Sequence, residues 1–329
     1  MLTRRDFATL AGSAIVGTAV GTAKGQTYPS RAIHIIVGYP AGGGVDVVAR
    51  LLGEPIKATL GQSVIVENRP GAAAMIAAQA VATAAPDGYS LLMAAAGEIA
   101  TNQHLYGDKM TYDAQRDFIP VALVGIVPCV VVVAASSPVR TPAGLIAYAR
   151  ANRGKLSFSS SGIGNPQQLA GELMNSLAGT DVLHVPYRGS APAVTDVAVG
   201  VVTMSFSSLA AALPLIQDGR LRAIAVTSRE RMPQLPDVPP LSDGAPELAD
   251  YELLNWFGLF APTGTPEPIV MRLSDTVNAS LRDQALAQKL EAQGIVPRPL
   301  TPDEFRAFVA ADVEKFGRIV RQANIKVEN

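Results

Sequence analysis

Short apolar runs alternate along this chain with segments in which apolar residues recur at helical spacing. Ile33–Val37 is a β-branched run that predicts a buried strand, and Val45–Leu60 has the spacing of an amphipathic helix. Strands are expected at Val64–Val66 and Tyr89–Met93, with an Ala-rich helix from Ala72 to about Ala85 between them. This order of elements predicts a parallel sheet with right-handed crossovers.

The alternation restarts after a long strand-like passage, Val121–Ala135. The elements expected next are a helix from Thr141-Pro142, strands at Leu156–Ser159, Val182–Val185, Val201–Phe206 and Leu221–Val226, and helices near Gln167–Leu177 and Ala191–Val199. A Pro-, Asp- and Ser-rich connection over 229–246 precedes a strand near Trp256–Phe260 and helices after Pro266 and Pro302. The pattern predicts an α/β protein of two similar halves.

The N-terminal segment has the features of an export signal. Arg4 and Arg5 precede an apolar run, Leu10–Ala23, which is shorter than the roughly 18 residues of a membrane span. The arginine pair resembles a twin-arginine signal, and an ordinary secretory signal is the alternative. Either signal predicts a periplasmic protein whose mature chain begins near Gln26.

Charge and cysteine content narrow the function classes. The formal net charge of −1 becomes −3 when residues 1–25 are removed, because Arg4, Arg5 and Lys24 leave together with Asp6. A mildly acidic chain without a basic cluster is a poor partner for nucleic acid. Cys129, the one cysteine, rules out an intramolecular disulfide and is expected to be a small buried apolar residue.

Two glycine-rich loops are the candidate sites. The first, Tyr39–Asp46, joins a predicted strand to a helix, so its backbone N–H groups and the helix N-terminus could bind an anion. A tight turn capped by Asp46 is the alternative, and dinucleotide or phosphate-loop spacing is absent. The second, Ser159–Gln168, occupies the equivalent place in the second half. Together they predict a ligand cleft between two sheets.

Catalytic chemistry finds little support in the sequence. His34, His104 and His184 are scattered without zinc-ligand spacing, and Cys129 has no sequence hint of a base. The chain also has no G-x-S-x-G elbow. We expect no enzyme activity, no metal and no cofactor, and we expect Arg188 to be a solvated surface residue.

Six fragments, taken in order, resemble one family. They are YPAGGGVDVVAR (39–50), VENRPG (66–71), APDGYSLLM (85–93), HVPYRGSAPAVTD (184–196), LRAIAVTS (221–228) and WFGLFAPTGTP (256–266). Together they are similar to the Bug family, the periplasmic receptors of tripartite tricarboxylate transporters. The resemblance covers essentially the whole mature chain.

The resemblance implies a two-domain periplasmic-binding-protein fold of type II-like character, with parallel-rich sheets flanked by helices and a ligand cleft between the domains. Crossover strands are expected near Val121–Pro128 and Ala223–Ser228. The expected divisions are a signal over 1–25, domain 1 over 26–124 and 228–329, and domain 2 over 125–227.

The resemblance also implies carboxylate recognition by the two loops, partly through bridging waters. The residues expected to bind the ligand are Tyr39, Ala41, Gly42, Gly43, Gly44, Ala95, Ala96, Gly97, Ser160, Ser161, Gly162, Asn165, Tyr187, Gly189, Phe206 and Ser207. Many relatives have Phe-Asp-Asn where this chain has Phe206-Ser207-Ser208. Because serine is neutral, we expect a non-aminated mono- or dicarboxylate, aliphatic or aromatic, rather than an amino acid.

The expected function is a monomeric binding protein that captures a small carboxylate for the membrane subunits of such a transporter. One alternative is an orphan receptor that presents its ligand-bound form to a sensor protein. A periplasmic hydrolase or isomerase is a third hypothesis, and turnover of a metabolite would support it.

Overall fold

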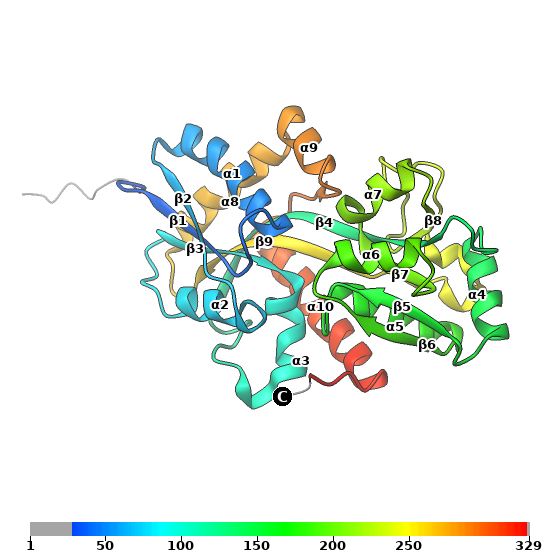
Figure 1. The fold of residues 1–329 in the computed structure, drawn as a ribbon. Helices are drawn as coiled ribbons and strands as arrows, with labels where there is room; N and C mark the ends of the chain where they lie inside the picture. The colour runs from blue at the N-terminus through cyan, green and yellow to red at the C-terminus, as the bar shows by residue number, and fades with distance from the viewer. Residues whose placement is uncertain (1–27, 328–329) are drawn as a thin grey trace, which may run out of the picture.

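The computed structural model describes residues 28–327, and the expected export signal lies outside them. Two α/β domains lie side by side, connected by two long strands, β4 (Phe118–Ala134) and β9 (Leu254–Pro262) (Figure 1). One curled mixed sheet runs through both in the order β2-β1-β3-β9-β4-β7-β5-β6, and β8 and β10 pair with β4. Within residues 28–327, no helix is both long and apolar enough to cross a membrane.

The first domain follows the predicted alternation closely. Its elements are β1 (Ile33–Val37), α1 (Gly44–Leu60), β2 (Val64–Asn68), η1 (Ala72–Ala74), α2 (Met75–Ala82), β3 (Ser90–Ala95), η2 (Gly97–Thr101), α3 (Asn102–Tyr106) and η3 (Gly107–Lys109). The chain returns to it as α8 (Glu267–Leu281), α9 (Gln284–Glu291), β10 (Val296–Pro297) and α10 (Pro302–Gln322). β1 is parallel to β2 and β3, while β9 is antiparallel to β3. α1 packs on this sheet because Val48, Leu52 and Ile56 share one fully buried face.

The helix expected from Ala72 is wrong at its start. Ala72, Ala73 and Ala74 have φ values of 47°, 52° and 68°, so this turn is left-handed and α2 begins only at Met75. Alanine rarely adopts this conformation, so a helix is the natural prediction from an Ala-rich sequence. Ala74 packs against Gly38 so closely that a β-carbon on Gly38 would collide with it. Tertiary packing therefore overrides local helix propensity here.

The second domain contains the other predicted α/β repeat. Its elements are α4 (Pro142–Ala151), β5 (Leu156–Ser160), α5 (Pro166–Ala178), β6 (Val182–Pro186), α6 (Ser190–Ala198), β7 (Met204–Ser208), α7 (Leu209–Gln217), β8 (Leu221–Val226), η4 (Leu241–Gly244) and η5 (Pro246–Leu248). β5 lies parallel to β6 and β7. The strand expected from Val201 begins at Met204, and Val201 is 67% exposed.

β4 changes partner in the middle of its length. Residues Phe118–Pro128 pair with β9 of the first domain, whereas Cys129–Val133 pair with β7 of the second. β8 joins the same half of β4 from Val130 onward. We therefore propose that the junction between the two domains lies at Pro128 and Cys129, a few residues after the expected boundary at 124.

The segment after β8 packs on the second domain. η4 contacts α4 and η5 contacts α5, and the Tyr251 hydroxyl donates a hydrogen bond to the carbonyl of Ala170 on α5 at 2.9 Å. We therefore propose that the chain leaves the second domain near Leu253, later than the expected boundary at 227. The chain then re-enters the first domain as β9, which begins at Leu254.

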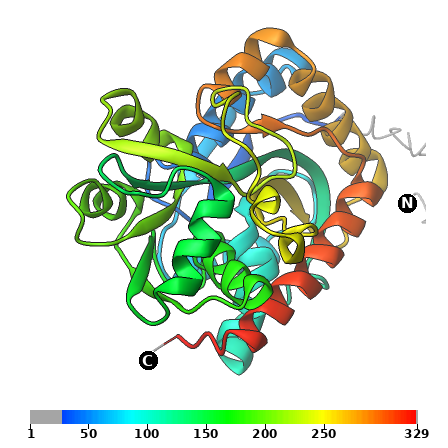
Figure 2. The same cartoon turned by 90° about the vertical axis from the view of Figure 1, so that its right-hand side faces the viewer.

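The C-terminal helix α10 contacts both domains. It packs against β4, η2, α3 and α8 and also against α5 of the second domain. Figure 2 shows it as the long red helix along one side of the molecule. A capping box fixes its start, where the Thr301 side chain accepts from the Glu304 N–H and the Glu304 side chain accepts from the Thr301 N–H.

Candidate ligand-binding site

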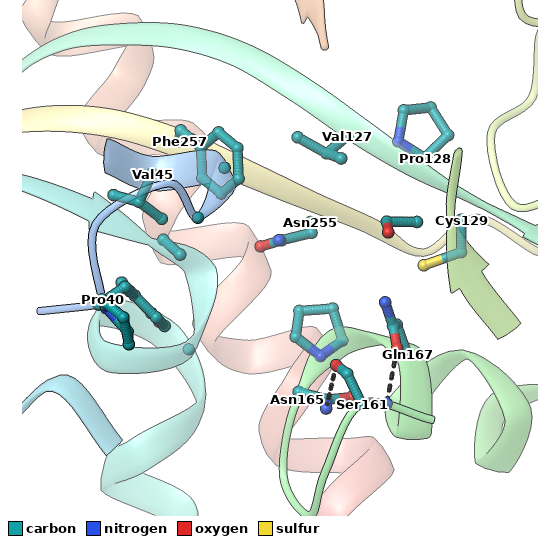
Figure 3. Close-up of a pocket in the computed structure, with 17 residues that line it drawn as sticks. Pro40, Val45, Val127, Pro128, Cys129, Ser161, Asn165, Gln167, Asn255 and Phe257 are labelled. Atoms are coloured by element: carbon teal, nitrogen blue, oxygen red, sulfur yellow. Dashed lines mark hydrogen bonds between the residues drawn. The ribbon is translucent and has the colours of Figure 1, made fainter. Parts of the chain in front are cut away.

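A cavity of about 380 Å³ lies where the two domains meet β4 and β9, a size in the usual range for small-molecule sites. Figure 3 shows Pro40, Val45 and Phe257 on one side of it and Ser161, Asn165 and Gln167 on the other. The 17 described residues that line it include no Asp, Glu, Lys, Arg or His. Any charge on a ligand must therefore be met by neutral dipoles.

The start of α1 forms one wall. Gly43 is the N-cap, and Gly44 and Val45 are the first residues of the helix, so their N–H groups have no partner within it. A β-carbon on Gly44 would lie 3.3 Å from the Phe257 ring. The glycine thus leaves the positive end of the helix accessible from the cavity, an arrangement that favours an anion.

Asp46 holds this first loop in place. Its carboxylate accepts hydrogen bonds from Gly42 N–H at 2.9 Å, Asn68 Nδ2 at 2.9 Å and Arg50 Nε at 3.0 Å. Burial alone would raise the pKa of Asp46, but these hydrogen bonds outweigh it and lower the pKa to about 2. The alternative interpretation of this loop was a tight turn capped by Asp46. In the structure Gly43 is the N-cap of α1, and Asp46 lies in the first turn and accepts the Gly42 N–H of the loop.

The loop before α5 supplies hydroxyl and amide groups from the second domain. Asn165 is the N-cap of α5, its Oδ1 accepting from Gln168 N–H, and its Nδ2 donates to Ser161 Oγ at 2.9 Å. The Ser161 hydroxyl can therefore donate its own proton into the cavity. Gln167 braces the loop, because its Oε1 accepts from Ser161 N–H at 2.7 Å and its Nε2 donates to Ser190 Oγ.

The connecting strands form the remaining wall. Asn255 on β9 accepts the Trp256 N–H with its Oδ1 at 2.9 Å, so its Nδ2 is the end that can donate to a ligand. Phe257, Val127, Pro128 and Cys129 make this wall largely apolar. The Cys129 side chain is buried, which raises the pKa of its thiol to about 12.

Seven of the sixteen residues predicted from the sequence line the cavity: Tyr39, Gly43, Gly44, Ala95, Gly97, Ser161 and Asn165. The other nine are not part of its lining: Ala41, Gly42, Ala96, Ser160, Gly162, Tyr187, Gly189, Phe206 and Ser207. Both glycine-rich loops thus reach the cavity, each through a few of its residues.

The side chains of several of the nine make contacts within the protein. Phe206 is fully buried and packs edge-on against Phe158 at a centroid distance of 5.6 Å. Ser160 is also buried, and its Oγ lies 2.7 Å from His184 Nε2. The Tyr187 hydroxyl donates to Asp196 at 2.6 Å. Phe206 and Ser207 were expected to line the cavity, but Ser208, the next residue, lines it instead.

Ten lining residues are not among the sixteen expected to bind the ligand, and four of these, Pro40, Val45, Pro166 and Gln167, lie within the two candidate loops. Sequence reasoning missed the other six: Val127, Pro128, Cys129, Ser208, Asn255 and Phe257. A usable signal existed for some of them. The expected crossover strand ended at Pro128, and a strand that joins two domains must pass their cleft. Asn255, a polar residue at the start of an apolar strand, was a second such signal.

The site has no arrangement typical of catalysis. The described residues contain no group of three or more His, Cys, Asp or Glu placed to hold a metal ion. Ser160 and His184 are within hydrogen-bond distance, but the Ser160 hydroxyl donates to Gly162 O at 2.8 Å. Burial lowers the pKa of His184 to about 4, which makes it a weak base at neutral pH.

Two α/β domains around a cavity, joined by two strands and lined by neutral donors, define a solute-binding protein. The sequence matches the family described as tripartite tricarboxylate transporter family receptor over residues 48–325. The chain belongs to this family of periplasmic binding proteins, whose members bind solutes and are not enzymes.

Relatives of known sequence and structure agree with this assignment. The protein BugT of Bordetella pertussis is 34% identical over 96% of this chain and 98% of its own length. R. palustris Rpa4515, solved with adipate, is 34% identical, with a TM-score of 0.80 over 91% of this chain and 99% of the other. MatC (Rpa3494) from Rhodopseudomonas palustris, solved with bound malate, is 31% identical, with a TM-score of 0.74 over 89% and 100%.

Proposed function

We propose that this protein captures a small non-aminated carboxylate in the cavity and delivers it to the membrane subunits of a tripartite tricarboxylate transporter. The observation that carries the proposal is the accessible N-terminus of α1, at Gly44 and Val45, facing Ser161 across a cavity without charged side chains. Neutral N–H and O–H donors can bind a carboxylate by hydrogen bonds, so the site does not need a Lys or Arg side chain.

The lining also favours an apolar body in the ligand. Val45, Val127 and Phe257 offer apolar surface, whereas an ammonium group would find no carboxylate among the lining residues. Losing water without an ionic partner costs a buried charge several kcal/mol. The adipate and malate bound to two relatives support a small non-aminated carboxylate as the ligand.

A thermal-shift panel at neutral pH tests this proposal. The panel contains adipate, succinate, malate, benzoate, aspartate and glutamate, because a ligand that binds only the folded state raises its melting temperature. We expect shifts with one or more of the first four acids and none with the two amino acids. Shifts with aspartate or glutamate alone would contradict the proposal. Loss of uptake of the same acid in cells that lack this protein tests delivery to a transporter.

A further inference from the structure

A buried carboxyl group lies directly behind the cavity wall. Glu98 is on η2 and is only 1% exposed. Its Oε2 accepts the hydroxyl of Tyr39 at 2.7 Å, and its Oε1 accepts the N–H of Ala95 at 2.9 Å. No salt bridge to Glu98 is found within residues 28–327. An ionised carboxylate in such a place is costly unless hydrogen bonds compensate it.

Both hydrogen-bond partners of Glu98 belong to the cavity lining. Tyr39 and Ala95 line the cavity, as does Gly97, the residue before Glu98. The Tyr39 hydroxyl is 3.6 Å from the position that a β-carbon on Gly97 would occupy. Glu98 is therefore separated from the cavity by a single hydrogen bond through Tyr39.

The surroundings of Glu98 allow it to change charge near neutral pH. Burial raises the pKa of Glu98 to about 7, although the hydrogen bonds from Tyr39 and Ala95 lower it. Of the elements packed against η2, β3 and η1 carry no titratable side chain and α3 brings His104 and Tyr106.

On α10, the carboxylate of Asp312 is paired with Lys315 at 2.9 Å. Outside these elements, Tyr112 donates its hydroxyl proton to the backbone carbonyl of Glu98. Neither the Asp312–Lys315 ion pair nor Tyr112 places a positive charge in hydrogen-bond contact with the Glu98 carboxylate.

We propose that Glu98 takes up one proton from solvent when a carboxylate enters the cavity, and that this proton makes the Tyr39 hydroxyl a donor to the ligand. The inference rests on the proposed capture of a carboxylate. It assigns Glu98 as a positioning residue that acts through Tyr39.

The two protonation states present different hydrogen-bonding groups to the cavity. An ionised carboxylate only accepts, so the Tyr39 proton must point to Glu98 and only lone pairs of its oxygen can face a ligand. Protonated Glu98 can donate to the Tyr39 oxygen, which frees the tyrosine proton for a ligand carboxylate. The second state also removes a negative charge near the incoming anion.

Glu98→Gln should mimic the protonated state. With the side-chain oxygen of the glutamine accepting from Ala95 N–H, its amide group faces Tyr39 as a donor. The measurement is calorimetric titration between pH 6 and 9 in buffers of different ionisation enthalpy. It uses the panel acid that gives the largest thermal shift.

For the wild type at pH 8, we expect uptake of more than about half a proton per ligand, and affinity that falls by up to about tenfold per pH unit above pH 7. For Glu98→Gln, we expect no uptake and an affinity that changes less than about twofold over the same range. Equal proton uptake by both proteins, or wild-type affinity that is constant with pH, would overturn the proposal.

Glu172→Gln is the matched control. Glu172 on α5 also has a pKa raised by burial, and it is not among the cavity lining residues. This variant should keep the wild-type pH profile of binding. If Glu172→Gln reduced the pH dependence of the affinity as much as Glu98→Gln does, the effect would not be specific to Glu98, and the proposal would be wrong.

A ligand-free measurement separates this proposal from the proposed function. In the unfolded chain Glu98 loses its proton above its ordinary pKa of 4.5, whereas in the folded protein it keeps the proton up to about pH 7. The contribution of Glu98 to the free energy of unfolding therefore falls as the pH rises from 4.5 to about 7. The free energy of unfolding of the wild type, minus that of Glu98→Gln, should fall across this window. His184 contributes an opposite slope in both proteins, which the subtraction removes. If no panel acid binds, the proposed function fails, whereas a flat difference curve overturns the role of Glu98.

Discussion

At the residue scale, Gly44 has the most direct effect on the site. It is the first residue of α1 and lines the cavity, and a β-carbon on it would lie 3.3 Å from the Phe257 ring. A methyl group there would cover part of the helix N-terminus. Glycine at this position therefore favours access of the ligand to the helix N-terminus, whereas alanine would favour the stability of the helix, because alanine is the better helix former.

Gly44→Ala should weaken binding of the panel acid about tenfold or more, which corresponds to about 1.4 kcal/mol. The same change should leave the melting temperature unchanged or slightly higher. Gly53→Ala is the control within the same helix, because a β-carbon there would only touch Val64 at 3.5 Å. Calorimetry and thermal unfolding check both variants, and an unchanged affinity for Gly44→Ala would place the ligand away from α1.

Part of the candidate site could be predicted from single residues. Glycine and serine clusters between a strand and a helix are local signals, so the loops at Gly43 and Ser161 could be found. Asn255 could not be predicted as a lining residue from its polar character alone. Its side chain lines the cavity only because one face of β9 meets the cleft, and the pairing of β9 with β4, which is distant in sequence, determines which face that is. Hydrogen bonds such as that between Tyr39 and Glu98 join residues 59 apart in the sequence and have no local signature.

At the element scale, the junction of β4 is held by two reciprocal hydrogen bonds. Cys129 N–H donates to Thr227 Oγ1 at 2.8 Å, and Thr227 N–H donates to Cys129 O at 2.9 Å. Thr227 is fully buried and follows β8 directly. Its hydroxyl therefore replaces a strand partner at the point where β4 passes from one domain to the other.

Thr227→Val should lower the free energy of unfolding by about 1–3 kcal/mol, because it leaves the buried Cys129 N–H without an acceptor. Thr227→Ser keeps the hydroxyl and loses only a methyl group, so its loss should be smaller. Urea unfolding of the two variants checks this expectation. A valine variant as stable as the serine variant would show that the hydroxyl is not needed.

The sequence predicted the elements of both domains well where apolar periodicity was strong, as in α1 and β1. It failed at Ala72–Ala74, where contact with Gly38 imposes a left-handed turn. It also missed η2 and α3, which are too short to display a period. The apolar pattern does not mark the change of partner along β4, because both halves of the strand are equally apolar; only the resemblance to the Bug family implied a crossover strand there.

At the scale of the whole molecule, several contacts hold the two walls of the cavity together. Leu105 of α3 packs directly on Gly164 before α5, where a side chain would collide with it. Gln234 donates a hydrogen bond to the carbonyl of Glu291. Figure 1 shows α3 and α9 on opposite sides of β4 and β9, so these contacts join the first domain to the second at two separate places.

The proposed function requires that a carboxylate binds between these walls. A crystal structure of the protein grown with the panel acid of largest thermal shift tests it most directly. We expect carboxylate oxygens within hydrogen-bond distance of the Gly44 or Val45 N–H and of Ser161 Oγ, with the rest of the ligand against Phe257. A ligand bound outside this cavity, or with its carboxylate turned away from α1, would contradict it.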